Sequence, residues 1–144
     1  MKRSPQNSTS WKQAADSPHR SEELPKFVHV FTGPDETSVI EEKEFEMTEF
    51  LDTEGAHGLA SPIEQTPGIS FRMVKAGYFL DFHTAPRRQY SISLTGSIEL
   101  GLPDGTLKQY GPGTVLLAED MTGTGHSTRV IGDEDRFTII IPLS

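Results

Sequence analysis

The sequence predicts an all-β protein, an antiparallel sandwich or barrel, and three features of its 144 residues support this fold class. Short segments of alternating polar and apolar residues recur through the second half of the chain. Turns rich in Gly, Pro and Asp separate them roughly every 8–12 residues, a spacing typical of sandwiches and barrels. No stretch has the periodicity of an ordinary amphipathic helix, and no internal repeat is present. We expect roughly eight to eleven strands and almost no helix.

The first half of the chain divides into a polar segment and the start of the predicted domain. Residues 1–26 are rich in Ser, Pro, Gln and Asn, which predicts a flexible tail. The alternative is an arm that orders against the body or a second subunit through Trp11. Residues 27–144 form one predicted domain. It begins with a strand at 27–31, one or two strands within 38–50, and a long loop at 51–68.

The second half predicts eight strands, because each apolar-alternating segment ends at a recognisable turn. The turns include Thr95-Gly96, Pro103-Asp104-Gly105 and the Gly-rich loop 121–125. The predicted strands are 70–75, 78–83, 88–94, 97–102, 106–110, 114–119, 127–131 and 136–143.

Composition and charge exclude several classes of function. The chain has no Cys, which rules out disulfides, thiolate zinc sites, Fe–S clusters and thiol nucleophiles. The formal net charge is −8, and residues 1–26 carry five basic and three acidic residues, so the body is strongly acidic. An acidic body repels phosphate backbones, so we expect no nucleic-acid partner. No apolar run approaches the roughly 20 residues of a spanning helix, and no signal-peptide apolar region follows the N-terminus. We therefore expect no membrane partner and a cytoplasmic protein.

The spacing of Gly and His from residue 77 onward resembles the cupin superfamily of small RmlC-like barrels. The first cupin motif reads Gly, five residues, His-x-His, three or four residues, Glu, six residues, Gly. In this sequence Gly77, His83 and Gly96 keep every interval. Ala85 stands at the place of the second His, and Gln89 at the place of the Glu. Two of the three usual ligand types in this motif are therefore replaced.

The second cupin motif opens with Gly and closes with a His on the next strand, and Gly113 and His126 resemble these two positions. The loop before His126 is two residues longer than the pattern. The resemblance implies an antiparallel double-stranded β-helix, the cupin jelly-roll barrel, with its site in the barrel mouth. Cupins include dioxygenases, decarboxylases, isomerases, lyases and proteins without activity, so fold alone does not give the reaction.

The strand after His83 has two chemically different faces. Residues of odd number in 83–93 share one face, which reads His, Ala, Arg, Gln, Ser, Ser, and in cupins this face points into the barrel. The opposite face carries Tyr90, Ile92 and Leu94, which need a cover. Small single-domain cupins are commonly dimers, and we expect a homodimer here.

The replaced ligands leave two alternatives for a cofactor. In the first, a divalent metal (Fe, Mn, Zn or Ni) is held by His83 and His126, with the weak ligand Gln89 and Glu119 if its loop folds inward. In the second, no metal is bound, and the site works through hydrogen bonds and acid–base groups. A first-row metal usually needs three protein ligands of the His or carboxylate type, which the motif no longer supplies.

The candidate catalytic residues are His83, His126 and Gln89, because a histidine is the natural acid–base group at neutral pH. An arginine in the pocket would bind a carboxylate or phenolate through two hydrogen bonds. The alternative is that an arginine pairs with Glu119 or Asp120 and fixes the Gly-rich loop. His19, His29 and His57 lie outside the motifs and are taken as incidental. The candidate substrate-binding residues are Arg72, Tyr78, Arg87, Arg88 and Glu119.

These residues favour a small-molecule enzyme acting on an organic acid or phenolic metabolite. Isomerase, cyclase, lyase or decarboxylase chemistry suits a site with an incomplete ligand set. The alternatives are a non-catalytic ligand-binding or structural barrel, and, if a metal is held, a dioxygenase. The polar inner face favours a functional pocket, because a purely structural barrel would fill its interior with aliphatic side chains.

Overall fold

The computed structural model describes residues 24–144, and these residues form twelve strands and no helix. No described segment is a helix long and apolar enough to cross a membrane. The prediction of an N-terminal tail falls mainly on residues 1–23, which lie outside this part of the chain. The strands are β1 (Lys26–Thr32), β2 (Ser38–Glu44), β3 (Thr48–Leu51), β4 (His57–Ala60), β5 (Ser70–Val74), β6 (Phe79–His83), β7 (Gln89–Thr95), β8 (Ser97–Gly101), β9 (Leu107–Tyr110), β10 (Val115–Glu119), β11 (His126–Ile131) and β12 (Arg136–Pro142).

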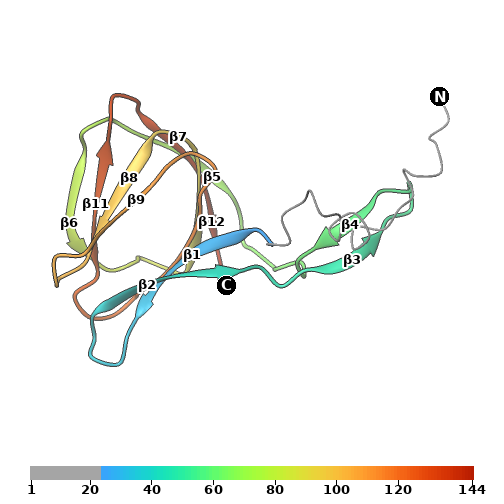
Figure 1. Ribbon diagram of the computed structural model, residues 1–144, viewed down its shortest axis with the longest axis horizontal. Coiled ribbons are helices and arrows are strands. Elements are labelled where there is room, and N and C mark those ends of the chain that lie inside the picture. Colours follow the sequence, from blue (N-terminus) through green and yellow to red (C-terminus); the bar gives the residue numbers. More distant parts are fainter. Residues whose placement is uncertain (1–23) are drawn as a thin grey trace, which may run out of the picture. The chain divides into compact units, whose positions relative to one another are not determined.

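The larger compact unit contains residues Lys26–Lys43 and Gln65–Ser144, and its strand order defines the fold. Eight strands make two four-stranded sheets, β5-β12-β7-β10 and β6-β11-β8-β9 (Figure 1). Two sheets connected in this order form a jelly roll. Strands β1 and β2 extend the first sheet beyond β10. The predicted all-β class and the cupin-like jelly roll are therefore confirmed, although β1 pairs with β10 in the parallel direction.

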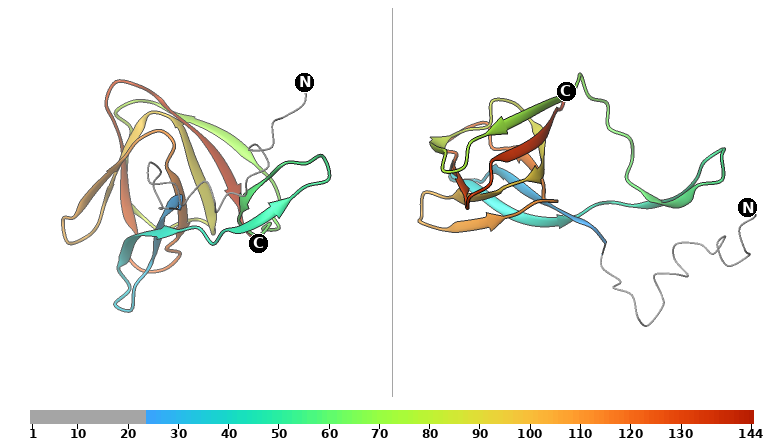
Figure 2. Two further views of the ribbon diagram at one scale, coloured as in Figure 1. Left: turned by 45° about the vertical axis from the view of Figure 1, so that its right-hand side comes forward. Right: turned by 90° about the horizontal axis from the view of Figure 1, so that it is seen from above.

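The core lies between the two sheets, whose strands curve around a common interior (Figure 2). Alternation along each strand sends every second side chain inward, and the inward positions are mostly aliphatic. In β7 the same alternation buries Gln89, Ser91 and Ser93, as the sequence pattern indicated. The buried residues that pack into one core cluster are Val28, Val30, Ala85, Ile98, Leu100, Leu116, Ala118 and Val130.

Residues Glu44–Glu64 belong to the smaller unit, which contains a hairpin of β3 and β4. The prediction of a continuous loop over 51–68 is wrong, because His57–Ala60 pairs antiparallel with Thr48–Leu51. A tight turn closes this hairpin, in which the amide of Asp52 donates to the carbonyl of Ala56 at 2.8 Å. This hairpin brings the described strands to twelve, above the predicted range.

Candidate functional site

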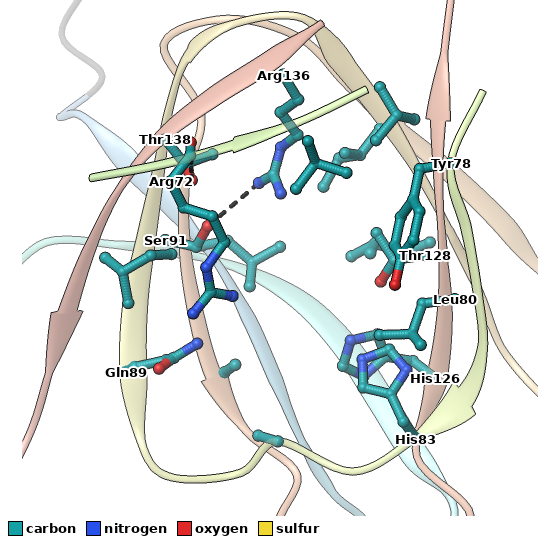
Figure 3. Close-up of a pocket in the computed structure, with 18 of the residues that line it drawn as sticks. Arg72, Tyr78, Leu80, His83, Gln89, Ser91, His126, Thr128, Arg136 and Thr138 are labelled. Atoms are coloured by element: carbon teal, nitrogen blue, oxygen red, sulfur yellow. Dashed lines mark hydrogen bonds between the residues drawn. The ribbon is translucent and has the colours of Figure 1, made fainter. Parts of the chain in front are cut away.

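A cavity of about 480 Å³ is lined by residues of both sheets of the larger unit. Its polar lining comes mainly from β5, β6, β7, β11 and β12 (Figure 3). None of the described residues that line it is Asp or Glu, although the protein as a whole is acidic. The apolar part of the lining includes Ile98, Leu100, Leu116, Ala118, Val130 and Ile140.

A buried carboxylate–histidine pair stands at one end of this cavity. Nδ1 of His126 donates a hydrogen bond to Oδ2 of Asp120 at 2.5 Å, and the exposed fractions of these two residues are 5% and 0%. Oγ of Ser38 donates to the same carboxylate oxygen at 2.6 Å. The other oxygen, Oδ1, is buried and has no hydrogen-bond partner among the described residues. Asp120 therefore holds His126 without itself lining the cavity.

The second histidine of the cavity, His83, lies beside the first. His83 and His126 are directly paired residues of β6 and β11, and their ring centroids lie 4.6 Å apart (Figure 3). The two strands approach closely here because Gly125 precedes His126. A Cβ at Gly125 would overlap the backbone carbonyl of His83, and its φ of 80° disfavours any side chain.

The hydrogen bonds fix which ring nitrogen of each histidine carries the proton in the neutral form. Nδ1 of His83 lies 2.8 Å from the backbone carbonyl of Asp81, which only accepts, so this nitrogen donates. Nδ1 of His126 likewise donates to Asp120. Both rings therefore keep Nε2 as a free base, the atom that can take a proton from a ligand.

Two arginines lie on a different part of the cavity lining from the histidines (Figure 3). Arg136 begins β12 and donates from Nη2 to the hydroxyls of Ser91 and Ser93 at 3.2 and 3.3 Å. Its Nε is buried and has no partner among the described residues. Arg72, on β5, is exposed. Burial and then the charge of Arg72 lower the pKa of Arg136 to about 10, still well above neutrality.

The predicted site residues do not all lie at this cavity. His83, His126, Gln89, Arg72 and Tyr78 line it. Gln89 is on the wall opposite the histidines, where its Oε1 accepts from Nη1 of Arg87 at 3.2 Å (Figure 3). Neither arginine of the pair at residues 87 and 88 is among the lining residues.

Glu119 belongs to a cluster outside the cavity lining. Nε of Arg88 donates to Oε2 of Glu119 at 2.5 Å, and Nε2 of His29 donates to Oε1 at 2.6 Å. Nδ1 of His29 accepts from Nζ of Lys43 at 2.8 Å, so this histidine has a structural partner on each nitrogen. Burial alone would raise the pKa of Glu119, but the hydrogen bonds of Arg88 and His29 outweigh it and hold that pKa below its ordinary value. The Arg88–Glu119 pair matches the alternative given in the sequence analysis, in which an arginine pairs with Glu119 instead of binding a ligand.

The resemblance to cupins implies a metal centre, and the donors of this cavity do not match one. His83 and His126 offer two Nε2 atoms, but Gln89 is on the opposite wall and Ala85 has no donor. Within residues 24–144 no group of three or more His, Asp or Glu side chains is placed to hold a metal ion. A first-row metal site usually has at least three such ligands. The chemistry proposed below therefore rests on side chains alone.

Sequence reasoning missed Arg136 and the role of Asp120. The sequence suggested that an arginine pairs with Glu119 or Asp120 and fixes the Gly-rich loop, but the carboxylate of Asp120 binds Ser38 and His126. Arg136 shares the inward face of its strand with Thr138 and Ile140, so its position in the alternating pattern was the available signal.

No protein-family model matches the sequence, and no curated protein matches it. Among solved structures, a Neisseria meningitidis protein is 16% identical, over 71% of this chain and 88% of that one, with a TM-score of 0.41. An RmlC-like cupin protein from Desulfovibrio desulfuricans is 20% identical, over 57% and 79%, with a TM-score of 0.37. The polyketide cyclase RemF from Streptomyces resistomycificus is 20% identical, over 81% and 75%, with a TM-score of 0.42. At these identities and TM-scores the comparisons carry no argument about function, and the strand order defines this chain as a small jelly-roll protein.

Proposed function

We propose that this protein is a small-molecule enzyme in which His126 moves a proton of a bound organic acid or phenol. The observation that carries the proposal is the buried Asp120–His126 pair at the wall of a cavity of about 480 Å³. A carboxylate that fixes the tautomer of a histidine and stabilises its protonated form is the arrangement used by general bases.

The proton transfer begins at His126. Its Nε2 takes a proton from an acidic C–H of the substrate, and the electron pair of that bond moves into a neighbouring carbonyl or ring. The imidazolium that forms is stabilised by the carboxylate of Asp120 behind it. Return of the proton to a different atom completes an isomerisation, and ring closure or loss of a leaving group from the same anion gives cyclase or lyase chemistry.

His83 is placed to act on the same part of the substrate, because its ring centroid lies 4.6 Å from that of His126. Its Nδ1 is tied to a backbone carbonyl, which orients the ring and leaves Nε2 for the ligand. We assign to His83, in its protonated form, the donation of the Nε2 proton to the oxygen or carbon that receives the electron pair; its Nδ1–H stays on the carbonyl of Asp81. Tyr78 and Thr128, which also line the cavity, supply hydroxyl groups near this end (Figure 3).

Hydrogen exchange tests the proposal without knowledge of the net reaction. A panel of small carboxylic acids and phenols with acidic C–H bonds is incubated with the protein in D₂O, and deuterium uptake is followed by NMR. We expect uptake in at least one compound, and a fall on the order of 10²-fold or more in the His126→Gln variant. His57→Gln, on the β3–β4 hairpin, is the matched control and should exchange at the wild-type rate. Equal rates in wild type and His126→Gln, or no uptake in any compound, would contradict the proposal.

A further inference from the structure

Arg136 is an incompletely satisfied cation at the cavity wall. A guanidinium has five N–H donors, and the described contacts of Arg136 use only Nη2, through the two serine hydroxyls. Its Nε is buried without a partner. The ion pairs among residues 24–144 leave Arg136 and Arg72 without a carboxylate. A largely buried charge that lacks a counter-ion destabilises a protein, and an anionic ligand bound beside it would remove that cost.

The second cation sharpens this argument. Arg72 lines the same cavity, and its charge disfavours the charged form of Arg136. Two like charges facing one space repel each other in the absence of an anion between them. The nearby polar groups of the lining, Ser91 and Thr138, are hydroxyls rather than acids (Figure 3). A carboxylate placed here would accept hydrogen bonds from both guanidinium groups and remove the repulsion.

We propose that Arg136 and Arg72 form a subsite for the carboxylate of a ligand whose body is apolar and whose reactive end lies at His83 and His126. The aliphatic side chains of Ile98, Leu116 and Val130 contribute to the lining that would contact the body. The ligand is therefore an aromatic or aliphatic monocarboxylate that carries its acidic C–H or O–H at the end away from the carboxylate. The position of the reactive end rests on the proposed function, whereas the carboxylate subsite is tested by binding alone.

Two unreactive probes of equal size show how much the negative charge of a carboxylate contributes to binding. 2-Naphthoate and its neutral amide, 2-naphthamide, have the same apolar body and differ at the head group. Binding is measured by calorimetry and by the rise in unfolding temperature. We expect wild type to bind the acid at least about tenfold more tightly than the amide. Equal binding of the two probes, or binding of neither, overturns the proposal.

Variants assign the preference to the subsite. Arg136→Met and Arg72→Gln should each bind the acid at least about tenfold more weakly, while their affinity for the amide stays unchanged. Arg129→Gln removes the same charge from an exposed arginine that lies over the ring of Phe79, and it should bind as wild type does. Retention of the acid preference in both Arg136→Met and Arg72→Gln overturns the proposal. Arg72 is exposed, so its variant tests the subsite even if the Arg136 variant fails to fold.

A stability measurement separates a binding role from a structural one. In the absence of probe, Arg136→Met should unfold at the same temperature as wild type or a higher one, because an apolar side chain replaces an unneutralised charge. A structural role for Arg136 would lower that temperature. If the probe binds through the two arginines but no compound exchanges hydrogen, the subsite is supported and the proposed catalysis is contradicted. If hydrogen exchange occurs but binding does not depend on the arginines, only the subsite is contradicted.

Discussion

The carboxylate of Asp120 joins two segments that are distant in the sequence, since Oδ2 accepts both from Ser38, 82 residues earlier, and from His126, six residues later. The first bond positions the carboxylate, and the second positions the histidine. The pair is therefore oriented before any ligand arrives, which is what a general base requires.

The two histidines should fail in different ways. His126→Gln removes the base, so it should lower both hydrogen exchange and product formation by about 10²-fold or more. His83→Gln leaves the base in place, so exchange should persist while product formation falls by roughly 10²-fold. The double variant should lose no more product formation than His126→Gln, because the two groups act in one sequence of steps. The comparison uses exchange and turnover of the same compound, and identical losses in the two single variants would contradict the division of roles.

Replacing Asp120 by Asn should move the proton of the neutral His126 ring from Nδ1 to Nε2. The amide of Asn can donate to Nδ1, which moves the proton of the neutral ring to Nε2 and removes the free base from the cavity. We expect a fall in exchange rate of the same order as in His126→Gln, about 10²-fold or more. Nitrogen-15 NMR of the imidazole reads the tautomer directly and does not depend on a substrate. Asp133→Asn, in the exposed turn before β12, is the control. An unchanged tautomer in Asp120→Asn would refute this role.

Gly125→Ala should destabilise the fold strongly, because the added Cβ overlaps the carbonyl of His83 and the backbone has a φ of 80°. We expect a loss of about 3 kcal/mol or more in the free energy of unfolding, measured by urea denaturation. Gly105→Ala is the matched control. It has a similar φ of 92° but open space around the site of the new methyl group. Its cost should be about 1–2 kcal/mol, the backbone penalty alone. Equal losses in the free energy of unfolding for the two variants would contradict this prediction, because they would show that β6 and β11 can move apart without destabilising the fold.

The Glu119 cluster should make stability depend on pH. The pKa of Glu119 is lowered from 4.5 because the hydrogen bonds of Arg88 and His29 outweigh burial, so folding favours its ionised form. Its stabilising contribution is therefore present above about pH 4.5 and is lost as pH falls through the lower folded-state pKa. Glu119→Gln should be less stable than wild type at pH 7, and the difference should shrink at about pH 3. Glu46→Gln, an exposed carboxyl, controls for net charge. A difference that does not change with pH would rule out this ionic contribution.

The predicted homodimer can be tested by light scattering. Leu94 is 43% exposed on the outer face of β7, and the edge strand β5 exposes Phe71 and Met73 by 60% and 65%. Apolar side chains gathered on a strand edge favour association. We expect a mass near twice 15.9 kDa at micromolar concentration. A mass of one chain that does not change with concentration would exclude the dimer.

The sequence predicted the all-β class and most of the strands well because their signals are local, whereas the jelly roll was implied by the resemblance to cupins. Turns rich in Gly, Pro and Asp bound the strands, and the observed β8 at Ser97–Gly101 differs from the predicted 97–102 by one residue. Alternation also predicted which side chains of β7 face inward, including Gln89 and Ser91. Both signals depend only on near neighbours in the chain, so a single sequence contains them.

The rest of the site depends on contacts between distant residues. Nothing near Asp120 in the sequence indicates that Ser38 will reach it from β2, and no motif contains Arg136. The hairpin at β3 and β4 was missed because its second strand, His-Gly-Leu-Ala, is short and poor in β-branched residues. His29 was taken as incidental, since its partners Glu119 and Lys43 come from other strands.

The bond between Ser38 and Asp120 has a consequence for the order of events during folding. It closes a loop of 82 residues, whereas residues that pair between strands β5 to β12 are at most 70 residues apart, at Ser70 and Ile140. Long loops cost more entropy to close, so distant contacts form later than local ones. Strand β1 must also find β10 before Ser38 can arrive. A refolding chain should therefore regain the circular dichroism of its sheets first, and recover turnover only when this last contact has formed.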